Sequence, residues 1–553
     1  MDIVEILQQL GPAGNSSSNN NTQVLVGFVS EPAGRGTISL LLSCLFTLAL
    51  CVWSSVHLDL PEPDEGTVRY TWRYLKWSLL AVFGPELVVW AAWRQHISAR
   101  TLTSKIRALA GSGSQVANLT WSMTHSFYAG MGGFAIDIDM DMDMDRVNPD
   151  QRRRRLYLTA RGVLLLAECG LLPDMRPEEI QDKSKTDGGE KAMCCLQAGW
   201  MLVQVASRLA AGLPVTPLEI NTIGHVVCAL AIFVLWWHKP RWVREPTRLQ
   251  GDWTRCMCAF MYMCSHMSDS GSEKTALLDT MGAGAGAGDI SLLPAGFNRE
   301  RPEILSLVYE SPGPGFKLNT NGIRRARALQ ADGPGSTTTW SNIGDMIMDS
   351  SDSRLEDSPG MEAATEAMRQ ARWKLASEAV QRYAPVRQRL QKQQRDSKSG
   401  RKPEELIQGR PRDWPGDHLV HGVPGIYMGT TLWLMSMVFG AVHVAGWHDQ
   451  FPSAVEAAMW RASSVYVVFS GLVWASINLL AHLSGAVWWL WYDLLAGRAS
   501  RACRVAIVAL CAVGGLLYLV ARLFLVAEAF ASLRALPVGA FLCPSWLLTV
   551  PHL

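Results

Sequence analysis

The sequence lacks the short motifs by which many enzymes are recognised. It has no glycine-rich phosphate loop, no nucleophile elbow and no HExxH zinc motif. The segment Gly111–Ser114 contains glycine and serine without the spacing of a phosphate loop. Enzymatic activity is therefore disfavoured, and we predict no catalytic residue and no bound cofactor.

Histidine and cysteine are also not placed for metal binding. No pair among His418, His421, His443 and His448 has the His-x-x-x-His spacing of ligands on one helix, and no cysteine accompanies them. Cys256 and the nearby cysteines lack a second pair at the spacing of a zinc site. The sequence therefore predicts no metal ion.

Charge is scarce in this chain, and apolar residues are abundant. Only 18% of the 553 residues are charged, 48% are hydrophobic and 22 are tryptophan, and the formal net charge of +2 gives no reason to expect nucleic acid as a partner. Apolar and very polar blocks alternate, which brings the mean hydropathy to +0.08. We therefore expect an integral membrane protein in a lipid bilayer. No basic segment and cleavage site precede the first apolar run, so we expect no removable signal peptide.

Residues 192–238 contain two apolar segments, 192–213 and 216–238, joined by a short turn with two prolines. Each segment has about the 20 residues that a helix needs to cross a bilayer. The second ends in tryptophans followed at once by basic residues, which is typical of a cytoplasmic helix end. We predict a transmembrane hairpin with both ends in the cytosol. Arg208 and Glu219 face each other across its turn and are expected to pair.

Four further apolar segments have the length of a membrane span: 38–58, 423–446, 462–483 and 505–526. Basic residues are more frequent after the first segment than before it, which favours an external N-terminus. The predicted fold is an all-α membrane protein of about six transmembrane helices with both termini outside, in the plasma membrane or another secretory-pathway membrane. Its external tail, 1–37, carries glycosylation acceptors at Asn15 and Asn20.

Residues 74–93 are long enough to cross the membrane, but Pro85 and Glu86 lie near their middle. A carboxylate at this depth costs roughly 3 kcal/mol unless it is paired or neutral. Because a crossing would place the next basic residues outside, we favour an interfacial or re-entrant helix, with a crossing helix as the alternative. Glycosylation of Asn118 would contradict the re-entrant arrangement. A second interfacial or buried helix is predicted at 157–172.

The long segment 239–422 is predicted to be a cytosolic insert that is mostly disordered. Residues 269–359 have low complexity and cannot bury enough apolar surface to fold alone. Residues 360–396 favour a helix, and 382–402 form a dense basic stretch. This stretch predicts contact with anionic lipid at about 1 kcal/mol per basic residue near the surface, with a soluble helix as an equal alternative. Cytosolic proteins are the other expected partners of the insert.

Two shorter segments carry side chains with binding chemistry. Aspartate alternates with isoleucine or methionine over Asp137–Asp145, which on a strand would gather the carboxylates on one face as cation ligands. The glycine and glutamate of a calcium loop are missing, so a solvated acidic loop is favoured. The cysteines and methionines of Cys256–Cys264 predict an apolar patch lying on the bilayer, with reversible acylation as the alternative.

Few polar residues lie inside the predicted spans, and five of them form the candidate intramembrane polar site. Asn221 and His225 are four residues apart, hence on one helical face, and Asn478 and His482 repeat this spacing. Glu86 is the fifth member. A neutral histidine bonded to an asparagine of a neighbouring helix stabilises helix packing, which we favour. The alternative is a path for protons or substrate.

Several segments, in the same order along the chain, resemble a fungal family of multi-pass membrane proteins. The hairpin carries the core of the resemblance. The segments are 182–187 (DKSKTD), 197–200, 207–208, 213–219 (LPVTPLE), 236–240 (WWHKP), 34–37, 84–86 (GPE), 124–128, 132–134, 447–448, 451–452 and 459–461. The resemblance covers most of the chain outside about 269–408. It implies a multi-pass membrane fold, and it supplies no biochemical activity and no catalytic residues.

Two functions from different classes are predicted. The first is a membrane platform or receptor-like protein whose cytosolic insert recruits a protein partner or senses lipid. The alternative is a transporter or channel whose path is lined by the candidate polar residues. The insert, the scarcity of intramembrane charge and the lack of detectable internal repeats favour the platform. Convergence of Asn221, His225, Asn478 and His482 on an open cavity would favour transport, whereas scattered or closed contacts would favour a scaffold.

Overall fold

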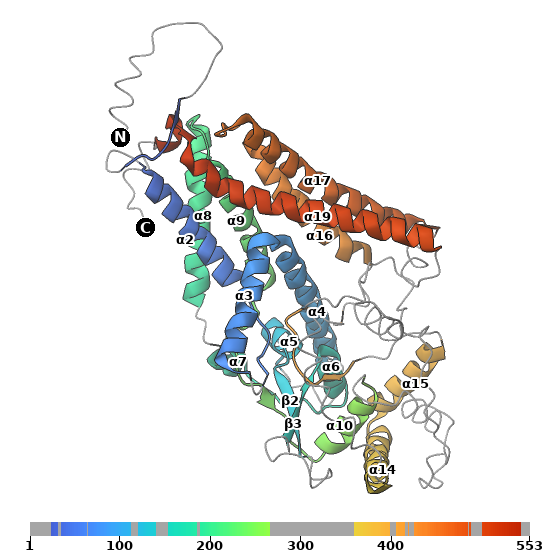
Figure 1. The fold of residues 1–553 in the computed structure, drawn as a ribbon. Coiled ribbons are helices and arrows are strands. Elements are labelled where there is room, and N and C mark those ends of the chain that lie inside the picture. Colours follow the sequence, from blue (N-terminus) through green and yellow to red (C-terminus); the bar gives the residue numbers. More distant parts are fainter. Residues whose placement is uncertain are drawn as a thin grey trace.

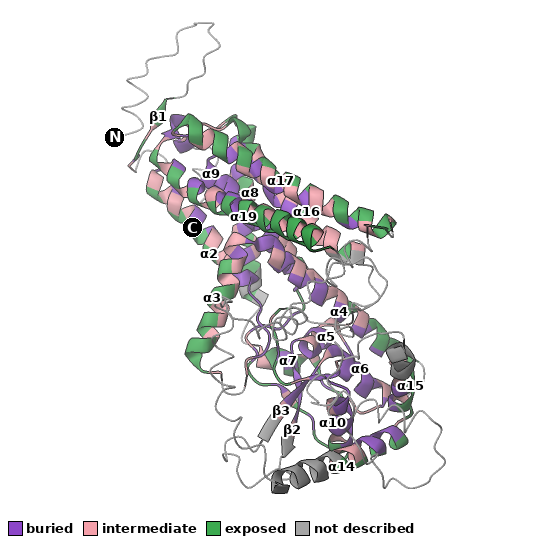
Figure 2. Ribbon diagram, turned by 45° about the vertical axis from the view of Figure 1, so that its right-hand side comes forward, coloured by how far each residue is buried: buried purple, intermediate pink, exposed green. Residues whose placement is uncertain are grey.

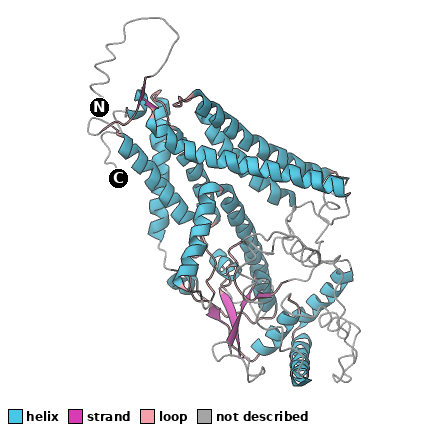
Figure 3. Cartoon of the chain, viewed as in Figure 1, coloured by secondary structure: helices cyan, strands magenta, loops and turns pink. Residues whose placement is uncertain are grey.

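The chain forms a helix bundle at one end of the molecule and a smaller unit, built around a sheet, at the other (Figure 1, Figure 3). This computed structural model describes residues 24–30, 35–62, 65–111, 120–139, 153–184, 188–265, 359–398, 405–414, 419, 425–484, 486–487 and 500–542. Most of these residues are helical, as predicted. The sheet is a departure from the predicted all-α fold.

The helix bundle is built from long apolar helices. Its members are α2 (Thr37–Ser55), α8 (Gly188–Ala210), α9 (Pro217–Leu235), α16 (Gly425–Val444), α17 (Ala454–Leu483) and α19 (Arg501–Ala531). Five of these are long and apolar enough to cross a membrane by length and composition, namely all except α8. The first half of the predicted hairpin forms a helix, α8, that packs beside α2 and α9. Its glutamines and Arg208 lower its hydropathy, so it is not among the candidate spans.

Two further helices, α3 (Thr67–Phe83) and α4 (Pro85–Gly111), meet at a bend of 112°. The bend lies at Gly84, where the proline that follows has no backbone N–H to continue the helix. Residues 74–93 are therefore not one straight helix. This bend is compatible with a broken span or with a re-entrant loop. It excludes a straight helix that crosses the membrane, but it does not choose between the two remaining arrangements.

The sheet has four short strands in the order β4-β2-β3-β5. They are β2 (Phe134–Asp139), β3 (Arg153–Leu158), β4 (Thr247–Arg248) and β5 (Ile407–Gln408), with β2 and β3 antiparallel. Asp137 lies opposite Arg155, and its Oδ1 is 3.0 Å from the arginine Nε. The predicted solvated acidic loop is thus wrong for 137–139, which form a strand, while 140–145 lie outside the described residues.

Six helices pack around this sheet to form the sheet unit. They are α5 (Met123–Gly130), α6 (Ala160–Glu168), α7 (Pro177–Lys183), α10 (Thr254–Met263), α14 (Pro359–Arg382) and α15 (Ala384–Lys398), joined by the second half of α4. α6 is buried, in agreement with the predicted helix at 157–172 (Figure 2). Cys256 and Cys258 are buried in the same core, so the predicted apolar patch on the bilayer is wrong there.

Much of the predicted insert belongs to the sheet unit. Residues 239–265, 359–398 and 405–414 are described, and Val386 and Leu390 of α15 are buried in the core. Arg389 of the basic stretch pairs with Glu168, with its Nε 2.9 Å from the carboxylate. The helix predicted at 360–396 is confirmed by α14 and α15. The prediction of a mostly disordered insert is wrong for 239–265 and 405–414, and residues 266–358 lie outside the described residues.

Both ends of the described chain meet at one end of the bundle. Strand β1 (Leu25–Val26) pairs antiparallel with β6 (Leu536–Pro537), beside the start of α2 and the end of α19 (Figure 1). The two ends of the described chain therefore lie side by side at this end of the bundle. Asn15, Asn20 and Asn118 lie outside the described residues.

Candidate functional site

The break between α3 and α4 leaves carbonyl groups at the end of α3 without partners in their own helix, and side chains of other helices form hydrogen bonds with them. The last four carbonyls of a helix lack partners within it. The carbonyl oxygen of Val82 is 2.8 Å from Nε2 of His225 on α9. The carbonyl of Phe83 accepts a hydrogen bond of 3.2 Å from Nε of Arg522 on α19. Side chains from two helices thus complete the end of α3.

Glu86 lies in the first turn of α4, where the partial positive charge of a helix N-terminus favours a carboxylate. Arg522 Nη2 is 2.8 Å from one carboxylate oxygen, and the hydroxyl of Tyr518 donates to the other at 2.8 Å. Glu86 and Arg522 are 3% and 2% exposed. Glu86 is therefore paired, as the sequence analysis required of a carboxylate in an apolar segment. Its partner, Arg522, was not among the predicted site residues.

Aromatic and histidine side chains surround this ion pair. The guanidinium of Arg522 stacks 3.6 Å from the ring centroid of Phe439 on α16. His443, one turn further along α16, lies 3.3 Å from Oδ1 of Asn221 through its Nε2. Ser436 hydrogen bonds with Tyr518 at 2.8 Å. We call Glu86, Asn221, His225, Ser436, His443, Tyr518 and Arg522 the polar centre.

The structure brings together Glu86, Asn221 and His225 of the five predicted site residues. Asn478 instead donates from Nδ2 to the carbonyl of Ile426 at 3.2 Å, near the start of α16. Ile426 precedes His443 by 17 residues on that helix, or about 25 Å of rise. His482 is exposed. The shared four-residue spacing of the two predicted pairs therefore did not indicate a shared site.

The sequence did contain a signal for the missing member of the polar centre. Arg522 lies inside the segment predicted as the last span, where an arginine is costly unless it is paired. Glu86 is a carboxylate within another apolar segment, and opposite charges at membrane depth tend to pair. Matching the two charges would have predicted the ion pair, but not that it lies at a helix break.

The polar centre is buried: Glu86, His443 and Arg522 are 3%, 0% and 2% exposed. Two cavities in the described part of the chain each have a volume of about 10 Å³, room for about one water molecule. One is lined by residues around Tyr70 and Trp242, the other by residues around Gln95 and Lys239, and no polar-centre residue lines either. Among the described residues, no three histidine, cysteine or acidic side chains are grouped so that they could hold a metal ion.

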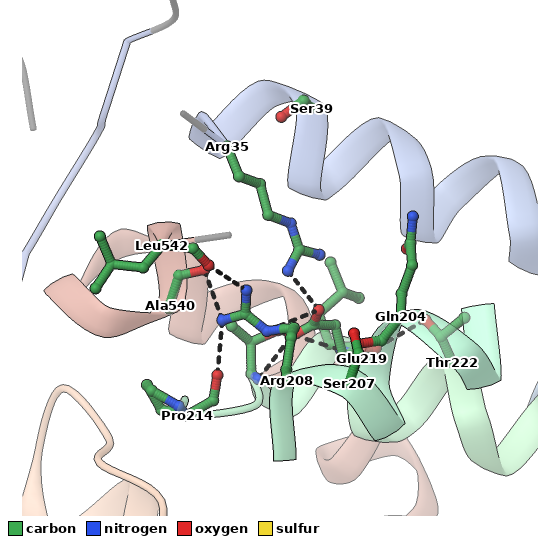
Figure 4. Close-up of polar contacts among 12 residues, drawn as sticks. Arg35, Ser39, Gln204, Ser207, Arg208, Pro214, Glu219, Thr222, Ala540 and Leu542 are labelled. Atoms are coloured by element: carbon green, nitrogen blue, oxygen red, sulfur yellow. Dashed lines mark hydrogen bonds and ion pairs between the residues drawn. The ribbon is translucent and has the colours of Figure 1, made fainter. Parts of the chain in front are cut away.

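A second ion cluster lies at the end of the bundle where the chain ends meet (Figure 4). Arg208 Nε is 3.8 Å from Glu219 Oε1, which confirms the predicted pair, and Arg35 Nη1 is 2.5 Å from the same oxygen. Arg208 also donates to the carbonyls of Pro214, at 2.8 Å, and Leu542, at 2.7 Å. Arg208 thus joins the turn of the hairpin to the segment after α19.

A third ion cluster lies between the bundle and the sheet unit. Lys239 Nζ is 2.8 Å from Oδ1 of Asp59, and both side chains are buried. Burial raises the pKa of Asp59 to about 6, although Lys239 lowers it. Arg73 of α3 pairs with Asp413 at 2.8 Å, and the Asp413 carboxylate accepts from the backbone N–H of Asp59. Lys239 is therefore the buried partner of Asp59.

A model of a family of unknown function (DUF8562) matches residues 6–280 and 427–553. Every residue of the polar centre falls in these two ranges, whereas α14 and α15 fall between them. No curated protein and no solved structure matches the chain.

Proposed function

The chain belongs to this family of unknown function, and we propose that it is a multi-pass membrane protein that acts as a receptor-like platform. Its sheet unit would lie in the cytosol and present residues 266–358 to a protein or lipid partner. The observation that carries the proposal is α4, whose first turn holds Glu86 of the polar centre and which continues as one helix into the core of the sheet unit.

The outer surface of the bundle supports a membrane location. Five helices are long and apolar enough to cross a bilayer, and no residue in the most apolar stretch of α19 is buried inside the structure. Leu510 and Leu516 of α19 are 73% and 61% exposed. Monomeric soluble proteins rarely leave so large an apolar surface in water. Lipid covering this surface would remove the cost.

The packing of the polar centre supports a structural scaffold rather than a transport path. Glu86 bonds Arg522 and Tyr518 directly, and His225 bonds a carbonyl of α3. These contacts leave little freedom for a substrate to pass. They fix the start of α4 relative to α9 and α19, so a shift of either helix would be passed to α4.

The anchoring of the insert supports presentation to a partner. α10 precedes residues 266–358 and α14 follows them, and the two helices pack side by side. Phe260 and Met257 of α10 share the core with Ala376 and Ala379 of α14. The two helices that flank residues 266–358 therefore pack against each other in the sheet unit.

Replacing Ser270–Ser358 by a flexible glycine-serine linker of the same length tests the platform. We expect proximity labelling in cells to lose the cytosolic partners of the full chain, while the unfolding temperature of the purified protein stays close to the original, because α10 and α14 are kept. A matched control replaces the exposed external residues of the α16–α17 connection instead. Unchanged labelling of partners after the linker replacement would contradict the proposal.

A topology test uses acceptors already in the chain. In the proposed arrangement, α3 and α4 form a re-entrant hairpin, so Asn118 stays cytosolic while Asn15 and Asn20 are external. Glycosidase treatment should shift the mass of the wild-type chain but leave the Asn15→Gln/Asn20→Gln variant unchanged. A remaining shift that needs Asn118 would place α4 across the membrane.

A proton-coupled transporter is the second candidate, favoured by one observation. Nδ1 and Nε2 of His225 lie 2.8 Å from the carbonyl oxygens of Asn221 and Val82. A neutral imidazole donates from only one nitrogen, whereas the protonated ring would satisfy both. With a broken helix at the same place, this arrangement is typical of transport proteins. Solute or proton flux that survives removal of Ser270–Ser358 and is lost in Glu86→Gln would favour transport.

A further inference from the structure

We propose that the outward face of α3 binds the headgroup phosphate of an anionic phospholipid in the cytosolic leaflet. This face, the α3 surface, consists of Val68, Arg69, Trp72, Leu75, Lys76 and Leu79. The proposal rests on the membrane location proposed above. It identifies which part of the chain would recognise lipid, and with which groups.

The α3 surface contains an apolar stripe that nothing in the described structure covers. Val68, Trp72, Leu75 and Leu79 recur every three or four residues and therefore share one side of the helix. Their exposed fractions are 85%, 53%, 44% and 46%. Because α3 packs against α2 and α19 of the bundle, acyl chains around those helices would also reach the stripe.

The depth of α3 places its basic residues near the headgroups. Val82 contacts His225, which lies midway along α9, so the break at Gly84 is level with the middle of this candidate span. Lys76 precedes Gly84 by eight residues, or about 12 Å of helix. Half of the hydrocarbon thickness is about 15 Å, and a lysine side chain can extend from this depth to the headgroups.

Charge on the α3 surface is complementary to phosphate. Lys76 Nζ lies 5.5 Å from the ring centroid of Trp72, and Lys76 has no carboxylate partner within the described ranges of the chain. Arg69, two turns toward the sheet unit, is 60% exposed at its side chain and 3.3 Å from Glu62. Such an exposed pair contributes little, so Arg69 can turn to a phosphate instead.

The other side of α3 is held in place by aromatic packing. Tyr74 stacks on Trp242 with ring centroids 5.5 Å apart, and it lies 5.1 Å from Trp53 of α2. Trp242 has φ of 61°, the only positive φ at a non-glycine residue in the described chain. Such a conformation persists only where the surroundings hold it. The α3 surface is therefore ordered before lipid arrives.

Two arginines of the basic stretch that was predicted to contact lipid, Arg387 and Arg389, are already bonded within the sheet unit. Arg389 pairs with Glu168, and Arg387 donates to the backbone carbonyls of Val380 and Gln381. Both side chains are used within the sheet unit. We therefore assign the contact with anionic lipid to α3 and not to α15.

Native mass spectrometry of the full chain tests this assignment. The protein, purified in detergent, is titrated with phosphatidylserine or phosphatidylcholine, and bound lipids are counted. We expect tighter binding of phosphatidylserine by wild type, about fivefold weaker binding for Lys76→Gln, and a further loss for Arg69→Gln/Lys76→Gln, since each basic residue near the surface contributes about 1 kcal/mol. Lys105→Gln is the matched control, because Lys105 is exposed on the part of α4 that enters the sheet unit.

Two outcomes would overturn the proposal. One is equal affinity of wild type and Lys76→Gln for phosphatidylserine, and the other is an equal loss for Lys105→Gln. Alkaline carbonate extraction of cell membranes separates this result from the proposed function. A chain that stays in the membrane pellet but binds both lipids alike would refute only the α3 assignment, whereas a chain released by carbonate would refute the membrane location itself.

Discussion

In the helix bundle, many apolar side chains are exposed and an ion pair is buried, whereas the sheet unit buries its large apolar side chains. Leu510 is 73% exposed and Arg522 is 2% exposed in the bundle. In the sheet unit, Met257 and Phe260 are fully buried, and Arg176 is 76% exposed at its side chain. The two regions are therefore suited to different surroundings, which is the physical basis for proposing lipid around one and water around the other.

The two regions meet at well-bonded junctions. α4 belongs to both of them. The segment 405–414 contributes β5 to the sheet and then Asp413 to Arg73 of α3. Lys239 and Asp59 form a buried ion pair between the bundle and the sheet unit. Such links would make the sheet unit move together with α3 and α4.

Breaking the polar centre should have the largest effect on stability. Arg522→Met leaves the buried carboxylate of Glu86 without its counter-charge, which should lower the free energy of unfolding by about 4 kcal/mol. The measurement is chemical unfolding in detergent, followed by tryptophan fluorescence. Glu86→Gln/Arg522→Met is the control and should regain most of the loss, because no charge then remains buried. A double variant as unstable as the single one would show that packing, not charge, dominates.

The same substitution in the two regions should give different results. Phe260→Ala in the sheet unit empties a buried site and should lower stability by about 3 kcal/mol. Phe469→Ala on α17 removes a side chain that is 58% exposed, so its effect in detergent should be under about 1 kcal/mol. Unfolding curves of both variants under one set of conditions make the comparison. Equal losses would contradict the outward orientation of apolar residues in the bundle.

The junction should respond to pH. The pKa of Asp59 is raised to about 6 in the fold from an ordinary value of 3.8, so between these values the folded chain binds a proton that the unfolded chain does not. Stability from this group is greatest below pH 4 and falls, by at most about 3 kcal/mol, as pH rises to 6. Unfolding of wild type and Asp59→Asn from pH 4 to 7 should show this slope only in wild type. An identical slope in both would assign it to other groups.

Substitution of Asn478 should matter less than substitution of Asn221, the other asparagine of the predicted site. Asn478→Ala removes one hydrogen bond to the carbonyl of Ile426, with an expected loss of about 1 kcal/mol. Asn221→Ala, which removes the contact with His443 in the polar centre, should cost more. The two variants are compared by unfolding in the same detergent. A larger effect of Asn478→Ala would show that the contact at the start of α16 contributes more to stability than the contact in the polar centre.

Hydrophobic pattern alone was enough to predict the long apolar helices. In a bilayer, a run of about 20 apolar residues can satisfy its backbone only as a helix. Pro85 and Glu86 marked 74–93 as different from the other runs, although the 112° bend itself was not predicted. The pairing of Arg208 with Glu219 was also predictable, because only a short turn separates them. These features depend on residues close together in the sequence.

Tertiary structure alone decided which distant residues meet. Arg522 reaches Glu86 from 436 positions away, and the sheet joins β2 and β3 to strands from 247–248 and 407–408. Segments this short carry no periodic signal strong enough to predict a strand, and their pairing depends on how α4, α10 and α15 pack around them. The sequence determined that charges in apolar segments must be paired, because burying them alone is costly. Only the packing of helices far apart in the chain chose the partners.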